Sequence, residues 1–383
     1  MKSDKTTPNV PTLRFDFDGI WNKIHLYEIT NKVSRKAPVN STAPIRMISY
    51  GNGFILQSDK YSRDNAGESL KKYTLLKKGE MAYNHGASKN KKYGVCYSLK
   101  ESDEARIPFV YHAFQINRGL PAFWNYALNI SQIDKQLKKL VSSGARMDGL
   151  LNISYDDYMS ISVYEPCVDE QAKISAFLSV IDKRIAVQNK IIEDLKVLKK
   201  ELCKVILNNK GWPKFRIRDI ANLGRGRVIN TDEINSQRSP IYPVYSSQTS
   251  NNGIMGYLDQ YDFEGEYITW TTDGANAGTV FYRNGRFNCT NVCGTLKLTV
   301  DFDYYITALS IQMVTEKYVS KNLANPKLMN NVMAEIEIFM PDIQTQKSLS
   351  SLFISLDKKI ESAGELLSCF VSEKKFLLNA IFI

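Results

Sequence analysis

Two long stretches of the chain carry apolar residues at alternating three- and four-residue steps, which is the spacing of one face of an α-helix. They run from Cys167 to Lys210 and from Asp342 to Ile383. Neither contains proline, and Gly364 is their only glycine. We therefore predict that each stretch is a single helix, and about 40 residues at the usual rise make a rod about 60 Å long.

The apolar stripe of each predicted helix needs a partner, because it would otherwise face water. In the first helix the stripe consists of Ile174, Leu178, Ile181, Ile185, Ile192, Leu195, Leu198, Leu202 and Val205. In the second it consists of Leu349, Phe353, Leu356, Ile360, Ala363, Leu367, Phe370 and Leu377. Gln188 interrupts the first stripe, and the step from Leu195 to Leu198 overwinds it locally.

The two helices are copies of each other. A shift of 175 positions brings Pro166 onto Pro341 and Gln171 onto Gln346 without a gap. The same shift aligns Ser175 with Ser350, Asp182-Lys183 with Asp357-Lys358, Ile185 with Ile360, Lys199-Lys200 with Lys374-Lys375, Leu202 with Leu377 and Ile206 with Ile381. The obvious partner for each copy is therefore the other, and antiparallel pairing would give the chain pseudo-twofold symmetry.

The segments in front of the two helices read as mixed α/β globules. They begin alike, since Trp21–Ile29 resembles Trp212–Ile220, and then diverge. Both are rich in aromatic and β-branched runs broken by Gly, Asn and Asp. In the second segment, for example, Gly265–Trp270 and Gly278–Tyr282 are expected to be strands joined by a turn at Asp273-Gly274. The expected fold class is α+β, in the order globule, helix, globule, helix.

Composition restricts the class of protein further. The chain has 383 residues, of which 43% are hydrophobic and 23% charged, which is typical of folded domains. No run of about 18 apolar residues predicts a membrane span, and no apolar segment behind Met1–Lys5 suggests a signal peptide. Six cysteines are too few for a disulfide framework, so we expect a cytoplasmic protein. The net charge of +10 favours a polyanionic partner such as nucleic acid.

The sequence contains no recognisable catalytic motif. It has no GxxxxGK[ST] phosphate loop and no GxGxxG after a strand. Asn325-Pro326 is followed by Lys327-Leu328 and not by the Pro-aromatic pair of amino-methyltransferases. Cys289 and Cys293 lack the second ligand pair that zinc sites usually have. None of the three histidines is accompanied by a nucleophile motif. We expect no catalytic, metal or cofactor site and predict a binding protein.

Several segments together resemble one family. The strongest are Glu170–Asp182 and Lys190–Leu202, with an opening of Pro11–Phe15 and Gly19–Trp21. The second globule adds Ser246–Gly253, Thr271–Gly278 and Cys289–Gly294. In these segments, their order and their duplication, the chain resembles the specificity subunit of a type I restriction–modification system. It departs from the family pattern at Asp342–Gln346, where an acidic pair more often precedes the glutamine, and at Gly364 and Cys369 inside the second helix.

The resemblance implies a DNA reader without chemistry of its own. Target-recognition domains at 1–165 and 211–340 would each read one half of a bipartite target, while helices at 166–210 and 341–383 would set the spacer. Two modification subunits docked on the helices would bring S-adenosylmethionine and methylate adenine at N6. Restriction subunits would use ATP and Mg²⁺ for translocation and cleavage. The alternatives are a coiled-coil scaffold with two protein-binding globules and a stand-alone enzyme, such as a nuclease with a degenerate site.

Base edges and phosphates are contacted mainly by amide, hydroxyl and basic side chains. In the first globule the candidates are Tyr83, Asn84, His85, Ser88, Lys89, Lys91 and Lys92. In the second they are Arg225, Arg227, Ser247, Gln248, Thr249, Thr271, Thr272, Asp273 and Asn276. The alternative for the first set is a solvated polar loop, and for the second it is turn chemistry or an exposed basic turn. Lys199-Lys200 and Lys374-Lys375 either neutralise spacer phosphates or form a solvated helix face.

Overall fold

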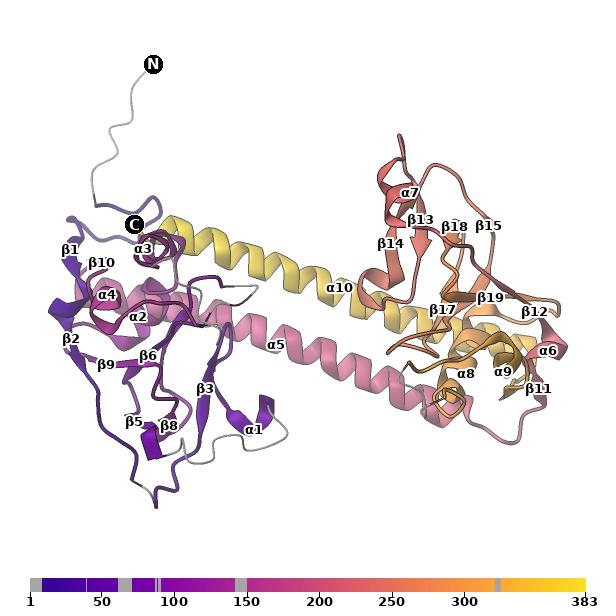
Figure 1. The fold of residues 1–383 in the computed structure, drawn as a ribbon, viewed down its shortest axis with the longest axis horizontal. Helices are drawn as coiled ribbons and strands as arrows, with labels where there is room; N and C mark the ends of the chain where they lie inside the picture. The colour runs from indigo at the N-terminus through magenta and orange to yellow at the C-terminus, as the bar shows by residue number, and fades with distance from the viewer. Residues whose placement is uncertain are drawn as a thin grey trace. The chain divides into compact units, whose positions relative to one another are not determined.

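The computed structural model describes residues 9–38, 40–60, 71–86, 88, 91–141, 150–320 and 325–383. The chain divides into two compact units (Figure 1). The first unit comprises residues up to Val187 together with Leu367–Ile383, and the second comprises Gln188–Leu366. Each unit is therefore built from a globule and parts of two long helices.

The two long helices are α5 (Val168–Leu207) and α10 (Ile343–Ile381) (Figure 1). In the first unit the beginning of α5 shares a core with the end of α10, and in the second unit the end of α5 shares a core with the beginning of α10. The pairing is thus antiparallel. The prediction of two mixed α/β domains and two long antiparallel helices is confirmed, whereas the division into four exact segments stays a prediction.

The contacts along α5 correct part of the predicted stripe. Leu198 and Val205 are 47% and 77% exposed, although the sequence pattern placed them between the helices. After Leu195 the buried or half-buried positions are Lys199, Leu202 and Ile206, with Cys203 and Leu207 packed into the globule of the second unit. The four-residue step from Leu195 to Lys199 therefore continues the stripe, because it keeps the helical period that the three-residue step breaks.

An aspartate in each unit joins the two helices to the globule. In the first unit Asp182 of α5 pairs with Lys374 of α10 at 2.5 Å and accepts a hydrogen bond from the Tyr126 hydroxyl at 2.7 Å. In the second unit the equivalent Asp357 pairs with Lys199 at 2.6 Å and accepts a hydrogen bond from the Tyr305 hydroxyl. The repeated lysines Lys199 and Lys374 are thus committed to interhelical ion pairs.

A glutamine fixes the start of each long helix in the same way. The Gln171 side chain accepts a hydrogen bond from the Leu120 backbone N–H at 2.8 Å and donates to the Pro166 carbonyl at 3.0 Å. Its copy, Gln346, accepts from the Asp303 N–H at 2.8 Å and donates to the Pro341 carbonyl at 2.8 Å. Both glutamines are completely buried. The duplication in the sequence therefore reproduces side-chain contacts as well as helix length.

The first globule contains one four-stranded sheet in the order β2-β9-β6-β7 and three two-stranded sheets, β1-β10, β3-β4 and β5-β8. The strands are β1 (Asn22–His25), β2 (Thr30–Lys32), β3 (Arg46–Ser49), β4 (Gly53–Leu56), β5 (Thr74–Lys77), β6 (Met81–Asn84), β7 (Val95–Ser98), β8 (Glu104–Ile107), β9 (His112–Ile116) and β10 (Ser162–Glu165). The helices are η1 (Leu26–Ile29), α1 (Gln57–Lys60), α2 (Pro121–Ala127), α3 (Ser131–Leu140) and α4 (Tyr155–Met159). All of the strand pairs are antiparallel.

The second globule contains two four-stranded sheets, β12-β19-β16-β17 and β14-β13-β18-β15, and the pair β11-β20. The strands are β11 (Lys214–Arg216), β12 (Ala221–Arg225), β13 (Tyr242–Tyr245), β14 (Ile254–Leu258), β15 (Phe263–Glu264), β16 (Tyr267–Thr271), β17 (Val280–Arg283), β18 (Arg286–Cys289), β19 (Cys293–Leu298) and β20 (Glu337–Phe339). The helices are α6 (Ile217–Ile220), α7 (Thr231–Asn235), η3 (Ser250–Gly253), α8 (Tyr304–Thr315) and α9 (Asn330–Ala334). The expected strand pair at Gly265–Trp270 and Gly278–Tyr282 is present as antiparallel β16 and β17.

Each globule is closed at its base in the same way. The first strand of the globule pairs antiparallel with its last strand, β1 with β10 and β11 with β20, and the last strand leads directly into α5 or α10. A short helical turn after the first strand then bonds back to the chain, from the Leu26 N–H to the Ile161 carbonyl and from the Ile217 N–H to the Ile336 carbonyl, both at 3.0 Å. The similar openings at Trp21 and Trp212 therefore form equivalent structures.

Candidate nucleic-acid interface

Two neighbouring loops of the second globule bring most of its predicted DNA-binding residues together. The loop between β13 and β14 carries Ser247, Gln248 and Thr249, and the loop between β16 and β17 carries Asn276. The Asn276 side-chain amide donates to the Ser247 carbonyl at 3.2 Å, which joins the loops. The Gln248 amide donates to the Ile254 carbonyl, so its carboxamide has a defined direction. Hydroxyl and amide groups therefore lie on one joined pair of loops.

Three other candidates in this part of the globule have structural contacts. Thr271 and Thr272 are completely buried, and the Thr272 hydroxyl donates to the Asp273 carboxylate at 2.7 Å. The same carboxylate pairs with Lys327 at 3.4 Å. These contacts stabilise the β16–β17 loop from inside. They occupy the Thr272 hydroxyl and the Asp273 carboxylate, whereas the Thr271 hydroxyl is buried and has no hydrogen-bond partner among the described residues.

The two arginines after β12 differ in their surroundings. Arg225 is exposed, and its only described hydrogen bond runs to the Met329 sulfur at 3.5 Å. Arg227 is held between Glu233 at 2.6 Å and Asp262 at 3.0 Å. The hydrogen bond from Arg227 lowers the pKa of the Glu233 carboxyl below its ordinary value. Arg225 is thus available to an anion, whereas two carboxylates already neutralise Arg227.

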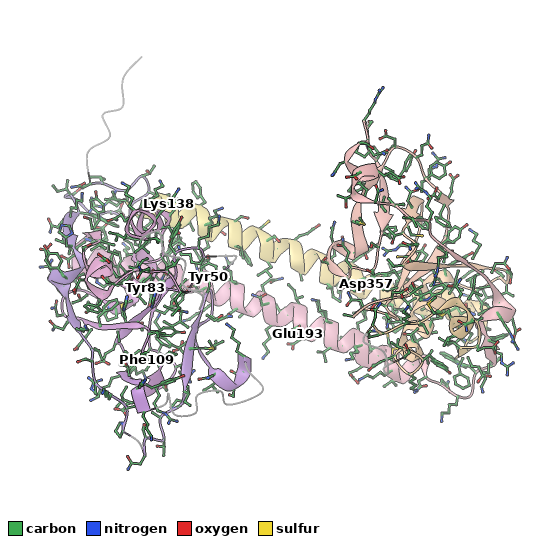
Figure 2. All side chains as sticks on the ribbon, viewed as in Figure 1. Tyr50, Tyr83, Phe109, Lys138, Glu193 and Asp357 are labelled. Atoms are coloured by element: carbon green, nitrogen blue, oxygen red, sulfur yellow. The ribbon has the colours of Figure 1, made fainter. Side chains whose placement is uncertain are left out.

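In the first globule Tyr83 and His85 lie inside the protein rather than at its surface. Figure 2 shows Tyr83 within this globule, where its ring stacks on Tyr158 with 3.9 Å between the ring centroids. The His85 ring nitrogens lie 2.7 and 2.8 Å from the carbonyl oxygens of Leu151 and Val110. Asn84, between them in sequence, is half-buried, and its side-chain oxygen accepts the Gly86 N–H at 3.0 Å.

The turn that follows β6 places only part of its polar side chains at the surface. Ser88 and Lys91 bond to each other through their backbones, and Ser88 is exposed. The Lys91 ammonium is buried against the Asp134 carboxylate at 2.5 Å and the Asn129 carbonyl at 3.0 Å. Lys92 is exposed. Lys89 lies outside the described residues. The structure therefore brings Asn84, Ser88 and Lys92 near one turn and directs Lys91 inward.

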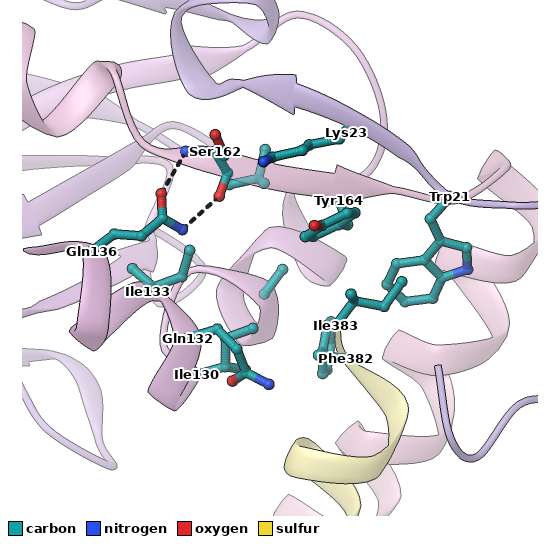
Figure 3. Close-up of a pocket in the computed structure, with 12 residues that line it drawn as sticks. Trp21, Lys23, Ile130, Gln132, Ile133, Gln136, Ser162, Tyr164, Phe382 and Ile383 are labelled. Atoms are coloured by element: carbon teal, nitrogen blue, oxygen red, sulfur yellow. Dashed lines mark hydrogen bonds between the residues drawn. The ribbon is translucent and has the colours of Figure 1, made fainter. Parts of the chain in front are cut away.

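A cavity of about 350 Å³ opens elsewhere in the first unit, between α3, β10 and the C-terminal residues (Figure 3). Trp21, Ile133 and Phe382 line it, and Gln136 beside them exchanges two hydrogen bonds with the Ser162 backbone, at 2.8 and 2.9 Å. None of the predicted DNA-binding residues lines it. The cavity is thus separate from the polar turn after β6.

The described residues offer neither a cluster of metal-binding side chains nor a membrane-spanning helix. No group of three or more His, Cys, Asp or Glu side chains in the described part of the chain could hold a metal ion. Among the same residues, no helix combines the length and the apolar character needed to cross a membrane.

Comparison with protein families gives one match. The family described as "Type I restriction modification DNA specificity domain" matches residues 209–367, which cover the second globule and part of α10. The sequence is also 32% identical over 216 residues to a proposed type I specificity subunit of Mycoplasma pneumoniae, S.MpnORF615P. This alignment covers 55% of this chain and 84% of the relative.

Two further relatives come from the same organism. The N-terminal part of the proposed type I specificity subunit S.MpnORF289P is 44% identical over 139 residues, covering 36% of this chain and 74% of its own. The specificity subunit of the type I restriction enzyme MpnII is 36% identical over 156 residues, covering 40% of this chain and 47% of its own. The chain thus spans about half the length of the MpnII subunit.

Two solved structures share the fold. The S subunit of a type I restriction–modification system from M. genitalium superposes with a TM-score of 0.60 and 15% identity, covering 98% of this chain and 99% of its own. A structure described for complex assembly and conformational transition of a type I system gives a TM-score of 0.57 at 11% identity, covering 95% and 98%. The similarity to both extends over nearly the whole chain.

Proposed function

This chain belongs to the specificity subunits of type I restriction–modification systems, and we propose that its two globules each read one half of a split DNA target. A subunit of this family determines which DNA target the system recognises, and other subunits carry out catalysis. The observation that carries the proposal is the duplication: equivalent glutamine and aspartate contacts seat two globules that differ in sequence on one helix pair. Two globules of different sequence, held on the helices by equivalent contacts, suit a DNA target with two different halves.

We assign base reading in the second globule to the joined loops with Ser247, Gln248, Thr249 and Asn276. Amides and hydroxyls of this kind recognise adenine and other base edges in the major groove. Exposed Arg225, the last residue of β12, suits a phosphate contact. Thr271, Thr272, Asp273 and Arg227 are left with a supporting role, because burial or carboxylates already occupy their polar groups.

In the first globule we assign DNA contact to the turn after β6, with Asn84 for base reading and Ser88, Lys89 and Lys92 for phosphates. Tyr83, His85 and Lys91 support this turn from within, because their polar groups bond to the protein itself. The functional set proposed from structure is thus smaller than the set proposed from sequence.

We further propose that the modification subunits dock on α5 and α10. Phe177 and Ile191 of α5 are exposed, and so are Leu352 and Leu366, the residues at the equivalent positions of α10. Exposed apolar residues that recur at matching positions suit two copies of one partner. S-adenosylmethionine would be bound by those subunits, and ATP and Mg²⁺ by restriction subunits, so this chain would hold no cofactor.

Methylation mapping tests the reading assignments. A host expressing this chain with its modification subunit would be analysed by single-molecule sequencing of methylated adenines, which gives both half-sites and the gap. Gln248→Ala should relax base preference in one half-site by about tenfold, since a bidentate contact discriminates by ~1–3 kcal/mol. Asn84→Ala should do so in the other half-site.

The matched control for these variants is Gln260→Ala, which removes an exposed glutamine of the second globule outside both loops. It should leave both half-sites unchanged. Complex assembly is checked for every variant by size-exclusion chromatography. If Gln248→Ala and Asn84→Ala assemble normally and methylate the wild-type sites with wild-type preference, the residue assignments are wrong. If the wild-type complex shows no bipartite motif, the proposed function itself fails.

A further inference from the structure

Arg283, the last residue of β17, is buried, and no acidic side chain among the described residues pairs with it. It is only 3% exposed. The guanidinium lies between two aromatic rings, 3.6 Å from the centroid of Tyr245 and 4.3 Å from that of Phe281. Its Nε donates to the Thr269 hydroxyl at 3.3 Å. Its Nη1 is buried and has no hydrogen-bond partner in the described part of the protein.

Two arginines of the first globule show the usual arrangement, a carboxylate partner. Half-buried Arg14 meets Glu170 at 2.7 Å, and exposed Arg35 meets Glu80 at 3.0 Å. Around Arg283 the groups that favour its charge are Tyr245 and the thiols of Cys289 and Cys293, while burial lowers its pKa. An arginine nevertheless stays protonated in proteins. Within the described part of the protein, the positive charge therefore meets two aromatic rings and neutral hydroxyl and thiol groups, but no carboxylate.

A buried, unpaired charge weakens a fold, so its presence calls for a functional explanation. Nε already bonds to Thr269, so the Nη1 and Nη2 edge of the guanidinium is the part that could meet a ligand. A negatively charged group would supply the missing counter-charge. A base edge is neutral and would leave the charge unpaired, which favours a phosphate oxygen over guanine as the ligand.

The cover over this edge is the loop that we assigned to base reading. Gly253 lies directly against the guanidinium, because a Cβ at this position would come within 3.1 Å of Nη2. Asn251, Asn252 and Gly253 have positive φ angles of 49°, 52° and 82°. The Gly253 carbonyl accepts the Ser246 N–H at 2.9 Å, which closes the loop. Movement of residues 246–253 would therefore expose Arg283 and change the position of Gln248 together.

We propose that Arg283 is a contact to a backbone phosphate of the target DNA that loop 246–253 covers in the free chain and uncovers on binding. The inference rests on the proposed function, since it assumes that this loop meets DNA. It adds a phosphate contact that sequence analysis missed, because nothing in the sequence distinguishes Arg283 from an ordinary arginine in a strand. Movement of the loop would expose the positive charge of Arg283, which a phosphate of the bound DNA would then neutralise.

The test compares Arg283→Met with wild type in the full complex with modification subunits, on duplexes carrying the mapped target. The variant should bind about tenfold more weakly, as expected for one hydrogen bond to a charged group. The plot of log affinity against log salt should become shallower by about 1, the value for one lost phosphate contact. Base preference in both half-sites should stay as in wild type. The temperature of unfolding should stay the same or rise.

Two controls identify the contact. Arg218→Met removes an exposed arginine of the same unit that pairs with Glu335, and it should leave the salt dependence unchanged. Duplexes with single neutral methylphosphonates along the bound half-site locate the phosphate. Wild type should lose affinity at one position where Arg283→Met does not.

An unchanged salt dependence in Arg283→Met would overturn the inference. So would a marked fall in its unfolding temperature, which would assign the arginine to folding alone. If 7-deazaguanine reproduces the effect of the substitution and no methylphosphonate does, the arginine reads a base and the phosphate assignment is wrong. If the wild-type complex itself showed no preference for a bipartite target, the proposed function would be refuted instead.

Discussion

At the scale of single residues, the first globule holds two stacked histidines. The rings of His85 and His112 lie 4.9 Å apart at their centroids, with 9° between their planes. Both ring nitrogens of His85 face carbonyl oxygens, whereas a neutral imidazole has only one N–H to donate. His112 meets one carbonyl, that of Ile153, at 2.9 Å. The pair thus couples β6 and β9 to the segment that leads into α4.

Stability should fall on acidification because of His112. Burial lowers the pKa of His112 below its ordinary value, and the nearby His85 and Lys32 act in the same direction. The unfolded chain therefore binds a proton at a higher pH than the folded chain, so the free energy of unfolding decreases as pH falls below about 6.5. Urea unfolding at pH 7.5 and pH 5.5 should show this loss. His112→Phe, which keeps an aromatic ring in the stack, should reduce it, and an undiminished loss in that variant would contradict the assignment.

At the scale of elements, the long helices were predictable and the loops of the globules only in part. The repeated spacing from Ile174 onward determined helix length and pairing, since it depends only on local periodicity. The exposure of Leu198 and Val205 could not be predicted in this way. Whether each of them or the next residue, Lys199 or Ile206, faces the other helix depends on the packing of the second unit. Burial of Tyr83 follows from its pairing opposite His112 in β9 and its stacking on Tyr158, contacts far apart in sequence.

The aspartates that join helices to globules give a prediction at this scale. Asp182→Asn and Asp357→Asn should each lower the free energy of unfolding by about 1 kcal/mol, because each weakens a partly exposed ion pair and a hydrogen bond from tyrosine. The two effects should be similar, since the contacts are equivalent. The control is Glu201→Gln, which alters an exposed pair with Lys204 within α5 and should change stability by less than about 0.5 kcal/mol. An effect of either aspartate substitution no larger than the control would show that these contacts contribute nothing to holding a globule.

At the scale of the whole molecule, the proposed spacer role depends on the continuity of α5 and α10 through both units. We consider a double deletion that removes seven residues from the middle of each helix, 188–194 and 362–368. Each deletion removes about two helical turns, so the remaining residues keep their facing, and each rod becomes about 10 Å shorter. That length is about three base pairs of duplex. The preferred gap between half-sites should therefore shorten by about three base pairs.

Methylation mapping of this double deletion measures the gap directly. The same deletion in α5 alone should abolish modification, because it shifts the pairing of Lys199 with Asp357 against that of Lys374 with Asp182. An unchanged gap in the double deletion would show that the helices do not determine the spacing.

The division of the chain between units has a consequence for its synthesis. Leu377, Ile381 and Phe382 complete the core of the first globule, yet they follow the second globule in the chain, so a ribosome adds them after it. The core of the first globule would therefore stay incomplete until the second globule has been made and residues 367–383 have left the ribosome. A message that stops before codon 377 would thus damage the half of the protein that was translated first.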